Sequence, residues 1–109
     1  MLIENKFKKD DVVSIKLSSG EELIGRYVKE DMQVLELSKV MSIVMTQQGV
    51  GLGPFMFSFD VDQKGFPKEN IKFSKTTVMA IGKTAEGFAA QFNSSVSGVE
   101  VAQKPSIIT

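Results

Sequence analysis

The side chains that usually carry out catalysis are scarce in this sequence. It contains no cysteine and no histidine, which excludes thiol nucleophiles, thiolate zinc sites, disulfide bridges and the most common general base. The remaining candidates are carboxylates. Glu21, Glu22 and Glu30 fall at expected turns and strand ends, where a solvated charge is the usual state, and no Gly-x-Ser-x-Gly nucleophile motif is present. We therefore expect that the protein is not an enzyme.

Two short stretches resemble ligand-binding loops without meeting their requirements. Asp60 and Asp62 invite a calcium interpretation, but the later ligands and the closing glutamate are missing, so an ordinary solvated loop is favoured. Residues 49–55, GVGLGPF, carry the glycines of a phosphate-binding loop, yet a strand rather than a helix is expected after them. We interpret this stretch as a flexible hairpin loop, and we expect no metal and no cofactor.

Composition limits the class of protein and its partners. The chain has 109 residues, 42% of them hydrophobic, which suits one globular domain with a modest core. Lysine and arginine total 13, as do aspartate and glutamate, so attraction to nucleic acid would have to come from a local patch. No apolar run approaches the roughly 20 residues of a membrane span, and the N-terminus is too charged for a signal peptide. With the lack of cysteine, these features predict a cytoplasmic protein without membrane contact.

The elements that would position binding residues begin with a hairpin. Apolar and polar side chains alternate through residues 13–18, which is typical of a half-buried strand. Ser19-Gly20 then predicts a turn. The next strand has Leu23 and Tyr27 on one face with Gly25 between them, and a glycine inside a strand marks a sharp bend or a close backbone approach. Strongly bent strands are what a small barrel requires.

A long third strand is expected from residue 33 to residue 46. Its apolar residues share one phase, interrupted by Lys39; they are Leu35, Leu37, Met41, Ile43 and Met45. A straight strand of this length would extend about 45 Å at roughly 3.3 Å per residue. A small domain cannot accommodate that, so we expect a bend or bulge near Ser38-Lys39.

Three further strands and a helix complete the expected architecture. Residues 55–61 carry the strongest strand signal, with Phe55, Phe57 and Phe59 on one face, where a core role is favoured over a base-stacking platform. After a loop at 62–69, residues 70–73 and 78–81 are expected to form strands. Thr84 can cap a helix that Gly98 ends. Its apolar stripe predicts either a lid over the barrel's open end or a contact with a neighbouring subunit; the residues of the stripe are Ala85, Phe88, Ala89, Phe92 and Val96.

The organisation predicted from these segments is a single domain, 1–109. It consists of a charged lead-in at 1–11, a barrel at 12–82, a helix at 84–97 and a loose tail at 98–109. The lead-in is compatible with one helical turn or with an extra edge strand. In the tail, Val99 and Val101 are compatible with a strand extension.

Three residues of the first half have a distinctive spacing. Gly20 follows the alternating strand, Gly25 lies five residues later, and Asp31 lies six residues after Gly25. This resembles the first sequence motif of the Sm and Sm-like RNA-binding proteins. Residues 73–81, FSKTTVMAI, have the length of the family's second motif, in which an apolar residue precedes a basic-glycine-polar turn and a final strand follows. Phe73 and Val78 fit the apolar positions, and Ser74 and Lys75 stand in place of the basic residue and the glycine. The expected helix and the enlarged region 47–70 resemble divergent Sm-like proteins encoded by marine bacteriophages.

The resemblance implies a fold and an assembly. The fold would be all-β, a small, strongly bent, five-stranded SH3-like barrel of the Sm type with a C-terminal helix, in which Gly20 and Gly25 are structural glycines. The assembly would be a ring of identical subunits joined edge to edge through strands, with 55–61 and 78–81 as the edges. Such rings bind single-stranded RNA or DNA around the pore.

The resemblance also implies a binding site. The family's binding loops correspond here to Met32, Gln33, Ser74, Lys75 and Thr76. Met32 and Gln33 directly follow Asp31, whereas the family has Met-Asn three and four residues after its aspartate. The Gln33 amide could bond to a base edge, Met32 could lie against a base or in the core, and Lys75 would supply positive charge. Asp31 would hold the loop through backbone hydrogen bonds.

A protein-binding or structural ring without nucleic-acid contact is the alternative. SH3-like barrels serve both purposes, and a fold does not determine function. Zero net charge and the shortened loop after Asp31 favour this alternative, whereas Lys75 favours nucleic acid.

Overall fold

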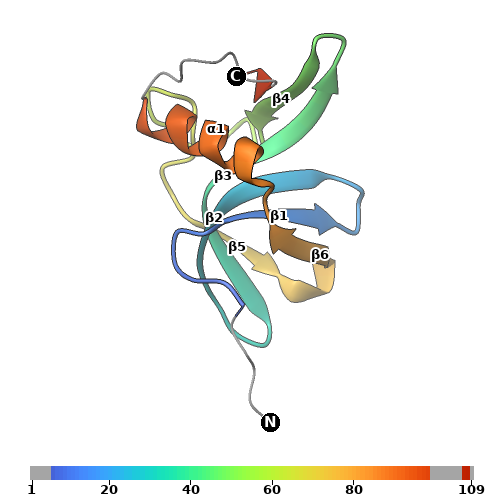
Figure 1. The fold of residues 1–109 in the computed structure, drawn as a ribbon. Coiled ribbons are helices and arrows are strands. Elements are labelled where there is room, and N and C mark those ends of the chain that lie inside the picture. The colour runs from blue at the N-terminus through green and yellow to red at the C-terminus, as the bar shows by residue number, and fades with distance from the viewer. Residues whose placement is uncertain (1–5, 99–106, 109) are drawn as a thin grey trace.

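The computed structural model describes residues 6–98 and 107–108. Within them the fold is mostly β-sheet with one α-helix near the C-terminus, as the sequence predicts (Figure 1). The elements are β1 (Val12–Leu17), β2 (Glu22–Glu30), β3 (Val34–Thr46), β4 (Gly49–Pro54), β5 (Ile71–Ser74), the 3-10 helix η1 (Lys75–Thr77), β6 (Val78–Lys83), α1 (Glu86–Ser97) and β7 (Ile107–Ile108).

The strands form one open sheet in which β3 is central. The order is β6-β1-β2-β3-β4-β7, and β5 also pairs with β3. The first part of β3 pairs with β5 and its second part with β4, so one long strand serves two neighbours. Within the described residues β5 and β6 are joined by η1 but are not paired with each other.

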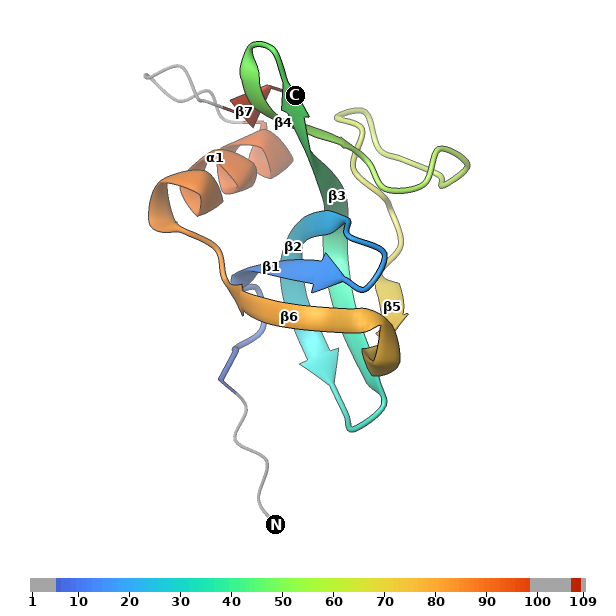
Figure 2. The same cartoon turned by 90° about the vertical axis from the view of Figure 1, so that its right-hand side faces the viewer.

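The first core lies inside the bend of the sheet. In Figure 2, β1 and β6 run across the view while β2 and β3 run lengthways, which shows how strongly the sheet curves. Strands β1, β2, β3 and β5 supply the buried side chains, and Val78 of β6 packs against them. The buried side chains are Val13, Ile15, Leu17, Leu23, Tyr27, Leu35, Leu37, Val40, Ile71 and Phe73.

The bend expected near Ser38-Lys39 is confirmed. Ile24 pairs with Met41 and Arg26 with Ser38, so β3 has one residue more than β2 between these two pairs. Lys39 in this bulge has a φ of 55°. The bulge also changes which face the later residues occupy: Val40 lies in the first core and Met41 in the second.

A second core lies on the opposite face of β1 and β2, beneath α1 (Figure 1). Its buried members are Val12, Ile24, Met41, Leu52, Phe66 and Phe92. The ring of Phe92 meets that of Phe66 edge to face, with centroids 5.7 Å apart. Phe88, Ala89 and Val96 pack around them, which confirms most of the predicted helical stripe. The helix therefore covers the second core and not the first.

The ends of α1 were predicted with mixed success. Gly98 ends the helix in the left-handed conformation, with a φ of 80°, as expected. The helix begins at Glu86, and the residue before it, Ala85, provides no side-chain cap. The cap predicted at Thr84 is wrong, because its hydroxyl is hydrogen-bonded to that of Ser14 at 2.8 Å.

No helix of the described residues is long and apolar enough to cross a membrane.

Residues 55–61 do not form the predicted strand, and the preceding glycine-rich stretch does. Gln47 and Gln48 make a two-residue turn, and Gly49–Pro54 then pairs with β3. Strands pair through backbone hydrogen bonds, which need no alternation of side chains. The glycine-rich segment can therefore pair with β3 as β4. Residues 55–60 follow as bends and turns. Of the three phenylalanines in this stretch, Phe55 and Phe59 pack against the first core, whereas Phe57 is 92% exposed.

The two chain ends differ from expectation where the structure describes them. Residues 6–11 form neither a helix nor a strand. Instead, the amide of Asp10 donates to the Tyr27 carbonyl and the amide of Tyr27 donates to the Asp11 carbonyl, both at 2.8 Å. Ile107–Ile108 pairs in parallel with β4, so the loose tail is wrong at these two residues. Val99 and Val101 lie outside the described residues.

Candidate functional site

Two loops predicted to share a binding site lie side by side. The first, residues 31–33, joins β2 to β3, and the second, residues 74–76, comprises the end of β5 and the start of η1, which leads to β6. Val34 pairs with Ser74, which aligns the ends of β3 and β5. Beyond this pair, the amide of Lys75 donates to the carbonyl of Gln33 at 2.8 Å. The segments therefore form one continuous surface.

The carboxylate of Asp31 holds the first loop. Its Oδ1 accepts hydrogen bonds from the amides of Gln33, at 2.7 Å, and Val34, at 2.8 Å. These bonds, with the Gln33 amide contributing most, lower the pKa of Asp31 below its ordinary value. Asp31 thus makes the backbone hydrogen bonds expected of a residue supporting this loop. This oxygen, Oδ1, is therefore occupied by its own loop.

Met32 and Gln33 point away from the protein at the tip of this loop. Met32 is 77% exposed and belongs to neither core. Its alternative assignment as a core residue is therefore wrong for the single chain. Gln33 is also exposed, so both an apolar thioether and an amide are presented to solvent.

Lys75 is engaged by a carboxylate that the sequence analysis did not include in the site. Its ammonium Nζ lies 2.5 Å from Oε1 of Glu30, the last residue of β2. The other oxygen of Glu30 accepts a hydrogen bond from the hydroxyl of Tyr27 at 3.0 Å. Burial, followed by this hydrogen bond and the charge of Glu30, raises the pKa of Tyr27 to about 12. The three side chains form a chain of contacts from the first core to the site.

Hydroxyl groups complete the second loop. Ser74 and Thr76 are exposed, and their hydroxyl oxygens are 2.9 Å apart. The hydroxyl of Thr77 donates to the carbonyl of Ser74 at 2.7 Å, which holds the turn of η1. None of the residues of η1 is buried. The loop thus offers donors and acceptors on a surface that its own backbone keeps in place.

The surroundings of the loops carry both signs of charge. A cavity of about 300 Å³ beside the first loop is lined by Lys29, Glu30, Asp31, Val34, Glu36 and Lys72. With three carboxylates and two lysines, this cavity does not concentrate positive charge. Any attraction for a polyanion must therefore arise from individual lysines at its rim.

A larger groove follows the free side of β5. Its volume is about 570 Å³, and Lys72 is its one charged lining residue; the others are Leu17, Ser18, Ser19, Phe55, Met56, Phe59, Asn70, Ile71, Phe73, Ser74 and Thr77. In an antiparallel pair of strands, every second residue points its peptide groups at the partner strand. The amide of Lys75 bonds to Gln33, so the peptide groups of Ser74 and Lys72 point away from β3. The groove therefore borders backbone groups of β5 that face away from β3, although the Ser74 carbonyl among them already accepts the Thr77 hydroxyl.

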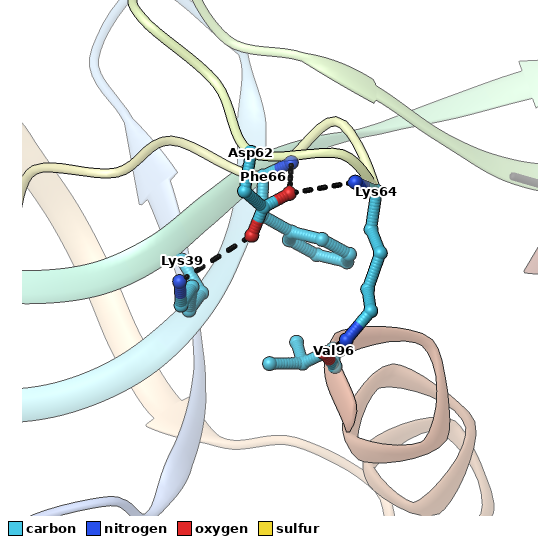
Figure 3. Close-up of polar contacts among 5 residues, drawn as sticks. All are labelled: Lys39, Asp62, Lys64, Phe66 and Val96. Atoms are coloured by element: carbon cyan, nitrogen blue, oxygen red, sulfur yellow. Dashed lines mark hydrogen bonds and ion pairs between the residues drawn. The ribbon is translucent and has the colours of Figure 1, made fainter. Parts of the chain in front are cut away.

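Asp62, one of the two aspartates considered for calcium, has a structural role in the chain (Figure 3). Oδ1 of Asp62 accepts from the amides of Lys64, at 2.9 Å, and Phe66, at 3.0 Å, and Oδ2 lies 3.5 Å from Nζ of Lys39. The Phe66 hydrogen bond is the main cause that lowers the pKa of Asp62. Lys64 in turn donates to the carbonyl of Val96 at 2.8 Å, near the end of α1. Asp62 thus ties its loop to the bulge of β3, and Lys64 ties that loop to the helix.

No protein-family model matches this chain, and no curated protein matches it either. The assignment of the two loops therefore depends on their geometry and chemistry.

Proposed function

We propose that the protein assembles into a closed ring and binds single-stranded RNA or DNA at the surface formed by residues 31–33 and 74–76. The observation that carries this proposal is the hydrogen bond between the amide of Lys75 and the carbonyl of Gln33. It joins the two segments that the resemblance to Sm-like proteins assigns to binding. A surface made by two loops can contact a base and its phosphate together.

The arrangement of strands supports the finer assignment to an Sm-type barrel. Five strands, in the order β6-β1-β2-β3-β5, surround the first core. They are strongly bent, and the residue at the bend of β2 is Gly25, one of the glycines of the motif. These are the features expected of a small five-stranded SH3-like barrel.

The two ends of this series of strands support a ring. Within the described residues, β6 pairs only with β1 and β5 only with β3, so each keeps an unpaired edge. Exposed apolar side chains lie on β6, where Met79 is 66% and Ile81 37% exposed, and a groove lies beside β5. Pairing of β6 with the β5 of the next copy removes both edges when the ring closes. Strand β5 takes the place of residues 55–61 as an edge.

The exposed groups of the loops suit one nucleotide per subunit. The amide of Gln33 can donate to and accept from a base edge, and Met32 can lie against the face of the base. The hydroxyls of Ser74 and Thr76 and the ammonium of Lys75 suit a phosphate or a ribose. Repetition around a ring converts weak contacts into useful avidity.

The assembly is tested by its mass. Light scattering coupled to gel filtration should give a mass several times 12.0 kDa. Met79→Lys places a charge on the free edge of β6 and should reduce the mass to that of one chain. Met45→Lys is the matched control, because Met45 is 79% exposed on the β3–β4 hairpin, away from both edges. A monomeric wild-type protein at micromolar concentration would contradict the ring.

Binding is tested with fluorescein-labelled twelve-nucleotide uridine and adenosine oligonucleotides, measured by anisotropy. Affinity should fall as salt rises, and Gln33→Ala should weaken binding roughly two- to tenfold for each subunit that the oligonucleotide contacts, because one hydrogen bond per subunit is lost. Gln47→Ala removes an exposed amide from the β3–β4 turn and should have no effect. Absence of binding at low salt would rule out the nucleic-acid part of the proposal.

A protein-binding ring is the second candidate. It is favoured by the ion pair between Lys75 and Glu30, which balances the positive charge of the site, and by the zero net charge of the chain. An assembly of the expected mass that binds neither oligonucleotide would support it.

A further inference from the structure

Glu30 occupies an unusual position between the core and the candidate site. One of its oxygens contacts the Lys75 ammonium at 2.5 Å, and the other accepts the Tyr27 hydroxyl at 3.0 Å. We propose that Glu30 is an internal competitor for Lys75, which a nucleic-acid phosphate must displace before Lys75 can bind it. This inference rests on the proposed function. It makes Glu30 a positioning residue that sets the affinity and the salt dependence of the site.

The contacts determine which partner moves. Tyr27 is 4% exposed and belongs to the first core, so its hydroxyl holds Glu30 in a fixed place. The backbone of Lys75 is also held, by the carbonyl of Gln33. The side chain of Lys75 is 32% exposed, whereas that of Glu30 is 18% exposed. The exchange is therefore a rotation of the lysine side chain out of the pair, toward a phosphate at the loop surface.

Among the described residues, Glu30 is the carboxylate at ion-pair distance from Lys75, and Asp31 acts on Lys75 only through its charge at longer range. Asp31 is close, but its Oδ1 is occupied by two amides of its own loop. Within the described residues, Lys29 and Lys72 at the adjacent cavity have no carboxylate at ion-pair distance. These lysines can attract a phosphate without any exchange. Lys75, which lies in the second binding loop, is the cation of this site whose availability depends on a carboxylate.

The test uses Glu30→Gln, which removes the charge and keeps an oxygen that can accept the Tyr27 hydroxyl. The variant should bind the labelled uridine oligonucleotide roughly three- to tenfold more tightly, because a partly exposed ion pair no longer has to be broken. The dependence of log K on log salt should become steeper by about 0.7 for each additional phosphate contact. Lys75→Gln should weaken binding.

A double-mutant cycle separates this mechanism from a general effect of charge. The gain from Glu30→Gln should disappear in the Lys75→Gln background. Glu22→Gln is the matched control, because it removes the same charge from the exposed first residue of β2 and should leave affinity unchanged. An equal gain from Glu22→Gln, or a gain that persists without Lys75, would overturn the inference.

The remaining outcomes distinguish this inference from the proposed function. If the wild type binds and Glu30→Gln binds no more tightly, Glu30 is not a competitor, and the proposed function stands. If neither protein binds at low salt, the proposed function fails. Should Glu30→Gln not fold, the wild type labelled at its lysine ammonium groups provides a second test by NMR. The Lys75 resonance, identified by its loss in Lys75→Gln, should then shift on saturation with oligonucleotide, and an unmoved resonance would overturn the inference.

Discussion

Replacing Phe92 by alanine is expected to lower the free energy of unfolding by about 3–5 kcal/mol. Phe92 is fully buried, and it is the only buried residue of α1. Its ring lies edge to face with that of Phe66, so the change opens a cavity between the helix and the segment that follows β4. Stabilities of small domains are about 5–15 kcal/mol, so this variant should lie close to unfolding. Urea unfolding followed by circular dichroism measures the effect.

Phe57→Ala is the matched control for this prediction. It removes the same ring from a side chain that is 92% exposed, and the expected change is within about 0.5 kcal/mol. If Phe92→Ala and Phe57→Ala unfold at similar urea concentrations, the second core does not hold α1 in the way described above.

Gly25→Ala is expected to cost about 1–3 kcal/mol, and Gly25→Val at least as much. A Cβ at Gly25 would lie 3.0 Å from the carbonyl oxygen of Ser38 and 3.2 Å from Cγ2 of Val40. The first contact is with backbone in the bulge of β3, which cannot move aside as a flexible side chain can. The thermal midpoint should fall by roughly 4–8 °C per kcal/mol for a domain of this size.

Gly82 provides the control for Gly25. It also lies within a strand, yet a Cβ there would meet nothing within 4 Å. Gly82→Ala should leave the thermal midpoint nearly unchanged or raise it slightly, because alanine restricts the unfolded chain. A midpoint for Gly25→Ala equal to that of Gly82→Ala would show that the bend of β2 tolerates a side chain.

The parts of the fold that could be predicted from sequence are those in which burial leaves a periodic pattern. The alternation of β1 and the stripe of α1 each reflect one buried face. Strand β4 could not be found this way, because its glycines carry no pattern and its pairing depends on the turn at Gln47-Gln48. Residues 55–61 carry phenylalanine or valine at every second position, yet the edge they would need on β3 is already occupied by β4.

The candidate site could be predicted only in outline. The spacing of Gly20, Gly25 and Asp31 predicted a binding loop after β2. The contact between Glu30 and Lys75 joins residues far apart in the chain, and it depends on how β3 aligns with both β2 and β5. No local pattern carries that information, so the balanced charge of the site became visible only in the folded chain.

The segment between β4 and β5 connects two strands that both pair with β3. Pro54 pairs with Met41 and Ile71 pairs with Leu37, so its two anchor points on β3 are four residues apart. Closing a loop costs only about 0.6 kcal/mol more for each doubling of its length. Phe66 anchors the later part in the second core, and Phe55 and Phe59 pack against the first core, whereas the tip at residues 56–58 is exposed. Evolution can therefore lengthen, shorten or replace this tip at small cost, and new binding specificities can arise there while the rest of the fold is preserved.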